Sequence, residues 1–285
     1  MSVLPEAFFL PIGTEPGNQR FCHFYPAQVT FSRGMVLYIH PFAEEMNKAR
    51  HMAALQTREL ARTGYSVLQM DLLGCGDSSG DFGDATWQSW VEDVLQGYRW
   101  LRQRCTSLGL ADEESPLWLW GLRAGGLLAV EAARQMDLAC HFVFWQPPAT
   151  GKLLLQQFLR LKVTSDLMGG QTKGLMQTLR QQLTDGLPIE VAGYTLSSGL
   201  TYGLEQATLA PPVCSDRARR VVWLELSTRE GASLSPASHQ LISDWQQAGF
   251  QLASHVVQGP AFWQTTELED APALILATTE ALAGD

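Results

Sequence analysis

The chain is 285 residues long, carries a formal net charge of −9, and is 46% hydrophobic but only 17% charged. These values exclude an intrinsically disordered chain and suffice for one large α/β domain with insertions, or for two small domains. The acidic balance, without a clustered run of Lys and Arg, excludes broad nucleic-acid binding, which needs such clusters to contact phosphates.

The cysteines indicate reduced thiols rather than a disulfide framework, because they are odd in number, scattered, and without a Cys-x-x-Cys pair. Residues 1–10 contain no Lys or Arg ahead of a long apolar stretch, so we expect no secretory signal. No run of about 18 apolar residues occurs, so we expect no transmembrane segment. We therefore expect a cytoplasmic protein, with peripheral membrane contact left open. The five cysteines are Cys22, Cys75, Cys105, Cys140 and Cys214.

Short apolar runs alternate with helical patterns through the first half of the chain. Continuous apolar runs between turn residues predict buried strands, and apolar residues at helical spacing predict helices. In chain order we expect strands at 7–10, 20–25 and 35–40, a helix at 45–63 ended by Gly64, a strand at 66–70, a glycine-rich loop at 71–78, a helix at 86–104, a strand at 116–120, a helix at 126–136 and a strand at 141–145.

The segment 151–212 interrupts this alternation, and we expect it to be a cap inserted over the carboxyl edge of the sheet. It holds a Leu-rich amphipathic stretch, a second helical pattern at 175–183, and a Gly/Ser/Thr-rich stretch that extends to Leu209. The core, 1–150 and 213–285, then resumes with a strand at 221–226, a helix at 236–248, a strand at 250–257 and a helix at 272–282. Such alternation predicts a mostly parallel, doubly wound sheet covered on both faces.

The pentapeptide Gly121-Leu122-Arg123-Ala124-Gly125 lies between a predicted strand and a predicted helix. That is the setting of the nucleophile elbow G-x-S-x-G, a sharp turn that directs its middle side chain into an active site. Here the middle residue is Arg123, so the frame is present and the nucleophile is missing.

Order and spacing resemble the α/β-hydrolase fold over almost the whole chain. More narrowly, the sequence resembles the exosortase A system-associated hydrolase family, type 2. This resemblance implies a product of bacterial loci for exopolysaccharide assembly and PEP-CTERM protein sorting, with partners among the exopolysaccharide-assembly proteins; it implies a fold but no particular reaction. The matching segments, taken together in this order, are 39–48 (IHPFAEEMNK), 69–80 (QMDLLGCGDSSG), 121–125 (GLRAG), 191–194 (VAGY) and 259–263 (GPAFW).

The backbone donors of an oxyanion hole do not depend on the nucleophile's side chain. In this fold one N–H comes from the loop after the third predicted strand, here His40 to Ala43 with Phe42 as the donor, and the other from Ala124. Together with the start of the following helix they make an anion site. Arg123 adds a permanent charge on a planar fork that suits a carboxylate or a phosphate.

Arg123 requires a carboxylate nearby, from the protein or from a ligand. A buried guanidinium without a partner costs on the order of 3–5 kcal/mol, by analogy with broken buried ion pairs. We expect an internal partner, with Glu44 or Glu45 favoured and Glu230 as a further candidate. Such a pair leaves room for a ligand beside it.

The other parts of a hydrolase triad are difficult to find. The acid usually follows the strand predicted at 221–226, where Glu225 and Glu230 lie; Glu230 is a candidate vestigial acid, although an ordinary loop acid is the simpler interpretation. The histidine normally follows the last strand, but 258–263 contains none, and His255 lies within the strand itself. Without a positioned base, no Ser or Cys is activated in the usual way.

Other candidate nucleophiles and bases lie at the same edge of the predicted sheet. Cys75 and Ser78 lie in the glycine-rich loop, whose spacing is a requirement of the fold, and His40 is near enough to act as a base. We expect no metal or other cofactor, because no histidines stand at ligand spacing and no H-E-x-x-H motif occurs.

Aromatic residues predict an apolar pocket for an acyl, lipid-linked or aromatic group with an acidic head, with plain packing between cap and core as the alternative. Three functions follow: a catalytically degenerate hydrolase that binds a small anionic or acyl ligand or a partner; an active ester or thioester hydrolase; and a scaffold whose cap docks a membrane-bound synthase. The absence of Ser and His favours the first and third. The aromatic residues are Phe42, Trp145, Phe262 and Trp263.

Overall fold

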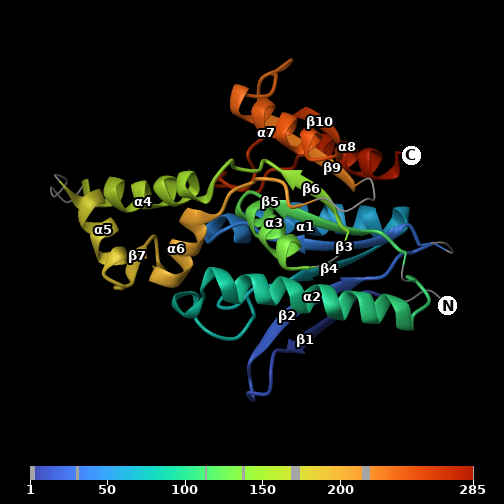
Figure 1. Ribbon diagram of the computed structural model, residues 1–285, viewed down its shortest axis with the longest axis horizontal. Coiled ribbons are helices and arrows are strands. Elements are labelled where there is room, and N and C mark those ends of the chain that lie inside the picture. The colour runs from blue at the N-terminus through green and yellow to red at the C-terminus, as the bar shows by residue number, and fades with distance from the viewer. Residues whose placement is uncertain are drawn as a thin grey trace.

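The computed structural model describes residues 4–29, 32–112, 114–136, 139–167, 174–213 and 219–284, with only the backbone of 164–167. Within these residues, eight strands form one sheet in the order β1-β2-β4-β3-β5-β6-β9-β10 (Figure 1). The strands are β1 (Glu6–Pro11), β2 (Gln19–Tyr25), β3 (Gly34–Ile39), β4 (Tyr65–Met70), β5 (Leu117–Leu122), β6 (His141–Trp145), β9 (Arg219–Ser227) and β10 (Phe250–Gln258).

The sheet is antiparallel at one edge and parallel elsewhere. Strand β2 pairs antiparallel with both β1 and β4, and every neighbouring pair from β4 to β10 is parallel. This confirms the predicted α/β fold with a mostly parallel sheet. The helices that accompany it are α1 (Glu44–Thr63), α2 (Trp87–Ser107), α3 (Ala124–Gln135), α7 (Pro236–Gln247) and α8 (Pro272–Ala283), with a short 3-10 turn η1 (Phe82–Asp84).

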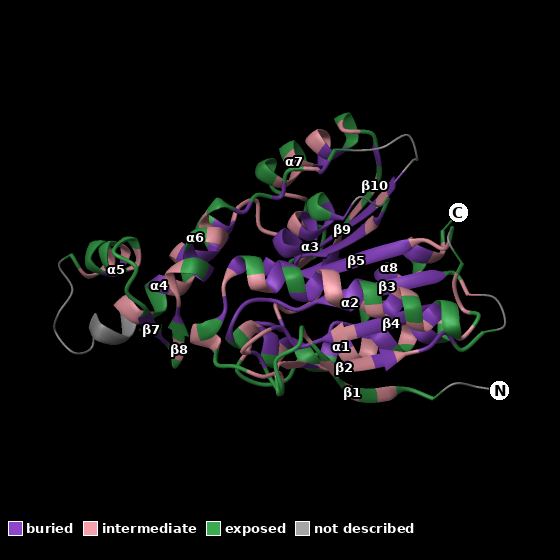
Figure 2. Cartoon of the chain, turned by 60° about the horizontal axis from the view of Figure 1, so that its bottom comes forward, coloured by how far each residue is buried: buried purple, intermediate pink, exposed green. Residues whose placement is uncertain are grey.

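Two hydrophobic cores lie on opposite faces of the sheet, because successive side chains of a strand point to opposite sides. In β5, Leu117 and Leu119 pack into the core that holds α2, α3 and α7. Trp118 and Trp120 pack into the core that holds α1 and α8. Burial is therefore concentrated in the central strands of the sheet, such as β3 and β5 (Figure 2), and helices cover both faces.

The cap segment 151–212 lies to one side of the sheet (left in Figure 1). It comprises α4 (Gly151–Leu167), α5 (Leu175–Thr184), β7 (Ile189–Val191), β8 (Tyr194–Leu196) and α6 (Ser198–Gln206). Only one α5 side chain, Leu179, is buried, which agrees with the largely exposed colouring of that helix in Figure 2.

The Gly/Ser/Thr-rich stretch after α5, for which the sequence predicts no particular element, holds a hairpin and a helix. Ala192 and Gly193 both have positive φ, at 50° and 83°, as the tight turn between β7 and β8 requires. Ser197 caps α6 by accepting a hydrogen bond from the N–H of Leu200. A Cβ on Gly203 would lie 2.2 Å from Cβ of Trp87, so the glycine content reflects close packing of α6 on α2 rather than a loop.

Two further expectations concern the whole chain. Among the helices that the structure describes, none is long and apolar enough to cross a membrane. The cysteines that the structure describes, Cys22, Cys75, Cys105 and Cys140, are buried and unpaired; Cys214 lies outside the described residues.

Candidate functional site

The turn between β5 and α3 has the geometry of an elbow. Arg123 takes φ 54° and ψ −118°, a region that side chains rarely adopt, and its N–H donates to the carbonyl of Trp145 at 2.9 Å. A Cβ on Gly121 would lie 2.4 Å from the N atom of Gly126, and one on Gly125 only 2.1 Å from the carbonyl oxygen of Ile39. The two motif glycines therefore let the start of α3 pass directly against the end of β3.

The side chain of Arg123 forms an ion pair with Glu45 at the start of α1. Its Nη2 and Nε lie 3.2 and 3.3 Å from Glu45 Oε1, and Nη2 also donates to Gln157 Oε1 of α4 at 3.3 Å. The side chains of Arg123 and Glu45 are 11% and 19% exposed. The guanidinium carbon lies 5.8 Å from the ring centroid of Trp263. The expected internal partner of Arg123 is therefore Glu45.

Glu44, the other expected partner, has different contacts. It accepts a hydrogen bond from Tyr194 Oη of β8 at 2.9 Å and one from Asn47 Nδ2 at 3.1 Å. Burial and this carboxylate raise the pKa of Tyr194, so the phenol stays protonated and donates. The two adjacent glutamates thus connect the core to different parts of the cap segment, Glu44 to β8 directly and Glu45 to α4 through Arg123.

A cavity of about 750 Å³ opens above Arg123. One wall comes from α4, where Leu154, Gln157, Phe158 and Leu161 recur at helical spacing. Its described lining includes no Ser, Thr, Cys or His, and its two acids and two bases balance in charge. Besides α4, the lining residues are Phe42, Glu44, Glu45, Lys48, Arg123, Gln146, Leu226, Ala261, Trp263 and Gln264.

Strained backbone gathers around this cavity. The described residues include four non-glycine positions with positive φ, and three of them, Ala43, Arg123 and Gln146, stand at or beside the cavity. Ala43, at φ 51° and ψ −131°, ends the loop after β3 much as Arg123 ends β5. Within the described chain we find no protein acceptor for the N–H of Phe42 or of Ala124. Strain of this kind concentrates at functional sites.

His40 lies away from the cavity and has both ring nitrogens engaged. Nδ1 lies 2.8 Å from the carbonyl of Pro41, and Nε2 accepts the N–H of Leu72 at 3.2 Å. Burial lowers the pKa of His40, against the opposing influence of Asp71, so the ring is neutral. It borders a separate cavity of about 20 Å³. This geometry gives His40 no proton-transfer route to a ligand beside Arg123.

The remaining candidate acids and bases also lie elsewhere. Glu230 is exposed in the loop after β9 and does not line the cavity. Glu225 accepts the indole N–H of Trp223 at 2.9 Å, and His255 is exposed on β10. All six histidines of the chain fall within the described residues, and none of them lines the cavity.

The glycine-rich loop holds its two candidate nucleophiles in structural positions. Burial raises the pKa of the Cys75 thiol, which disfavours the reactive thiolate. Ser78 Oγ donates to the carbonyl of Asp71 at 2.6 Å and accepts the N–H of Phe21 at 2.9 Å. Ser78 therefore fixes the loop, and Cys75 is a buried, protonated thiol.

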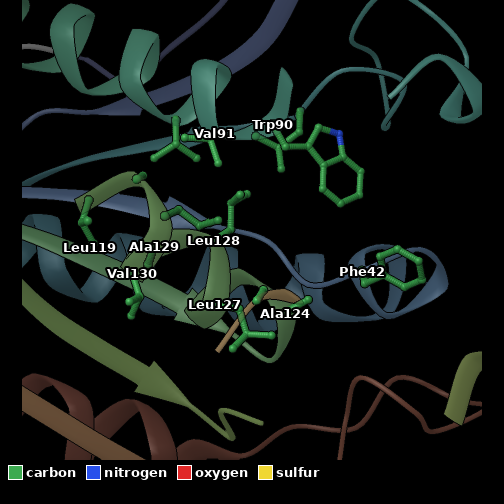
Figure 3. Close-up of a cluster of buried hydrophobic side chains, with 14 of the residues drawn as sticks. Phe42, Trp90, Val91, Leu119, Ala124, Leu127, Leu128, Ala129 and Val130 are labelled. Atoms are coloured by element: carbon green, nitrogen blue, oxygen red, sulfur yellow. The ribbon is translucent and has the colours of Figure 1, made fainter. Parts of the chain in front are cut away.

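Of the four predicted aromatic residues, two line the cavity and two support it from behind. Phe42 packs edge-on against Phe158 of α4, with ring centroids 5.0 Å apart, and stands at one end of the buried cluster that includes Ala124 (Figure 3). Trp263 lies 5.1 Å from Phe262, which in turn lies 6.1 Å from Trp145. Neither Phe262 nor Trp145 is among the lining residues.

Polar residues that the sequence did not single out complete the site. Gln157 bonds to Arg123, Gln264 donates to Glu45 at 3.5 Å, and Lys48 and Gln146 line the cavity. The available signals were weak: Lys48 follows Glu45 by three residues on α1, a spacing that places both on one helix face, and Gln264 directly follows Trp263.

The sheet, the elbow and the cavity together define an α/β-hydrolase. Residues 31–181, more than half of the chain, match the sequence model of the family described as serine aminopeptidase, S33, and the chain belongs to this family. The chain is 31% identical over 108 residues to a thermostable monoacylglycerol lipase of Bacillus sp. (strain H-257), across 38% of each protein. It is 28% identical over 123 residues to Protein ABHD12B of Homo sapiens, across 43% of this chain and 31% of that one. These matches span less than half the length of either relative.

Solved structures share the fold over nearly the whole chain. Est1E from Butyrivibrio proteoclasticus with ferulic acid bound superimposes with a TM-score of 0.63 at 16% identity, across 97% of this chain and 96% of that one. A soluble variant of monoglyceride lipase from Saccharomyces cerevisiae, in complex with a substrate analog, gives 0.58 at 15% identity, across 99% and 96%. At such identities the likeness shows the fold alone.

Proposed function

We propose that this chain is a catalytically degenerate member of its family that binds an acyl ligand with a carboxylate or carbonyl head. One observation carries the proposal: the position that the nucleophile occupies in a hydrolase elbow holds Arg123, whose guanidinium is paired with Glu45 at 3.2 Å. No described residue lining the cavity is a Ser, Thr, Cys or His that would attack or transfer a proton.

The mixed lining of the cavity supports an amphipathic ligand. It combines leucines, Phe42, Phe158 and Trp263 with charged and amide side chains. One relative is named a thermostable monoacylglycerol lipase, and Est1E has ferulic acid bound. The ion pair engages Nε and Nη2 of Arg123, and Nη1 makes no hydrogen bond within the described residues. A ligand oxygen can therefore bind Nη1 and the N–H groups of Phe42 and Ala124 while Glu45 stays in place.

We further propose that the protein works in the cytoplasm beside bacterial exopolysaccharide-assembly proteins. The support is the resemblance to the exosortase A system-associated family, type 2, in five segments, two of which (39–48 and 121–125) contain Glu45 and Arg123. The scattered cysteines agree with a reducing compartment.

Ligand binding tests the proposal directly. Fatty acids of graded chain length and monoacylglycerols are titrated by calorimetry and by thermal shift into the wild type, Arg123→Gln and the control Arg62→Gln, whose guanidinium on α1 is 71% exposed. We expect saturable binding to the wild type and the control, and binding at least about tenfold weaker to Arg123→Gln, because a hydrogen bond to a charged group contributes about 1.5–3 kcal/mol. Binding that is absent from the wild type, or unchanged in Arg123→Gln, contradicts the proposal.

A second candidate is hydrolysis of an ester or thioester with water as the nucleophile. The unpaired N–H groups of Phe42 and Ala124 favour it, since an oxyanion hole with substrate binding retains roughly 10³-fold catalysis without a triad. A panel of p-nitrophenyl esters separates the two functions. Turnover by the wild type that disappears in Arg123→Ala supports hydrolysis. We expect none, and no gain in Arg123→Ser, because no imidazole faces that position.

A further inference from the structure

The first part of the cap segment is basic, unlike the rest of the protein. Residues 151–187 contain five Lys and Arg against two Asp, which gives +3, whereas the rest of the cap segment, 188–212, adds two Glu and no base; the chain outside 151–187 carries −12. Salt screens exposed charges beyond about 8–10 Å, so a surface that touches only 151–187 responds to the charge of this part rather than to the net charge of −9.

Two of the basic residues of this region line one open groove. Arg160 of α4 and Arg180 of α5 both line a groove of about 560 Å³ between these helices. The other described lining residues are apolar or uncharged, and none is acidic: Gln156, Val163, Gly174, Met176 and Gln177. Two guanidinium groups on one groove suit the oxygens of a phosphate.

An exposed leucine accompanies these cations. With 3.6 residues per turn, Lys152, Leu153, Gln156 and Arg160 fall on one face of α4. Leu153 is 49% exposed, whereas Leu161, which is 54% exposed, lies about 80° further around the helix, on the side that lines the 750 Å³ cavity. A free phosphate or an anionic polymer would not bind the leucine, whereas a lipid bilayer binds both the cations and the apolar side chain, as it does with other basic amphipathic helices.

We propose that the face formed by α4 and α5 docks on an anionic lipid bilayer. Arg160 and Arg180 bind lipid phosphates, and Leu153 enters the interface between head groups and acyl chains. The strongly acidic remainder is repelled from the same surface, so the docked orientation is fixed with α4 and α5 against the bilayer. This docking does not depend on which ligand the cavity binds.

Co-sedimentation with vesicles tests the docking. The wild type is compared on phosphatidylglycerol and phosphatidylcholine vesicles with Arg160→Glu/Arg180→Glu and with a matched control on α1, Arg58→Glu/Arg62→Glu, where both residues are exposed. Each cation near an anionic surface changes the partition coefficient about fivefold. We expect the wild type to bind phosphatidylglycerol vesicles and not phosphatidylcholine vesicles, and high salt to abolish the binding. The cap variant should weaken this binding at least tenfold. The α1 control, which changes the net charge by the same amount, should weaken it less.

A second pair of variants examines the apolar part. Leu153→Ser on α4 is compared with Leu276→Ser on α8, which is 59% exposed, and only the former is expected to weaken vesicle binding. Circular dichroism establishes that each variant is folded. Equal binding to both vesicle types, equal loss in the cap and α1 reversals, or complete competition by soluble glycerol phosphate each overturns the proposal. The last result assigns the groove to a free phosphate.

Discussion

Two substitutions separate the energetic cost of the backbone bend at Arg123 from the contribution of its side-chain contacts. Arg123→Ala and Arg123→Gly both remove the ion pair with Glu45 and the bond to Gln157, but only glycine also removes the Cβ that opposes φ 54°. Backbone strain of this kind costs on the order of 1–3 kcal/mol, and glycine loses about 0.4–1 kcal/mol through the freedom of the unfolded chain. We therefore expect Arg123→Gly to be more stable than Arg123→Ala by about 0.5–2 kcal/mol.

Urea denaturation followed by tryptophan fluorescence measures this difference. The nine tryptophans give a strong signal. Relative to the wild type, Arg123→Ala should lose about 1–2 kcal/mol, because the pair is neither fully exposed nor fully buried. The matched control is Arg58 on α1, an exposed residue within a regular helix, where glycine should be less stable than alanine by about 0.5–1 kcal/mol. The same order at both positions refutes the reasoning, because it shows that the elbow carries no strain.

Three further predictions concern the frame, the pH response and the thiols. Gly125→Ala should lower the free energy of unfolding by about 3 kcal/mol or more, as in severe overpacking of a core, because its Cβ would lie 2.1 Å from the carbonyl oxygen of Ile39. Gly126→Ala, whose Cβ would lie 3.3 Å from the ring of Phe144, should change it by no more than about 1 kcal/mol in urea denaturation. Burial and the adjacent arginines lower the pKa of His141 to about 4. The stability that its neutral ring contributes is therefore complete above about pH 6.5 and is lost as the pH falls through about 4. His141→Gln should flatten the fall of the unfolding free energy between about pH 6.5 and 4, and an unchanged slope would show that His141 does not cause this fall. Burial raises the pKa of Cys22, Cys75, Cys105 and Cys140, so these thiols should react with a disulfide reagent at about pH 8 only after denaturant is added, and native modification of Cys75, detected by mass spectrometry, contradicts that expectation.

The order of the core elements could be predicted because each signal was local. Buried runs such as 35–40 and 141–145 are continuous apolar segments between turn residues, and each forms a strand at nearly the expected bounds. Gly64 ends α1 with φ 108° as expected. The helix α6 was missed, because its glycines pack against α2, a contact between residues far apart in the sequence.

The candidate site was predictable where it depends on topology and unpredictable where it depends on side-chain direction. Carboxyl ends of neighbouring parallel strands meet at one edge of the sheet, which brings Arg123 to Glu45. The same rule brings His40 to this edge, but the loop backbone turns its ring toward Leu72 instead. Gln157 depends on how α4 lies over the core, and no spacing in the sequence reports that placement.

The two glycines of the elbow have a consequence for how such proteins diverge. Each lies where two backbone segments are in close contact, Gly121 within the turn itself and Gly125 against the neighbouring parallel strand β3. The bend is thus a structural joint between helix and sheet, and it must persist whether or not a reaction occurs above it. The residue at the middle of the turn makes none of these backbone contacts with its side chain, so a single substitution there can remove the nucleophile of a hydrolase while the fold remains intact.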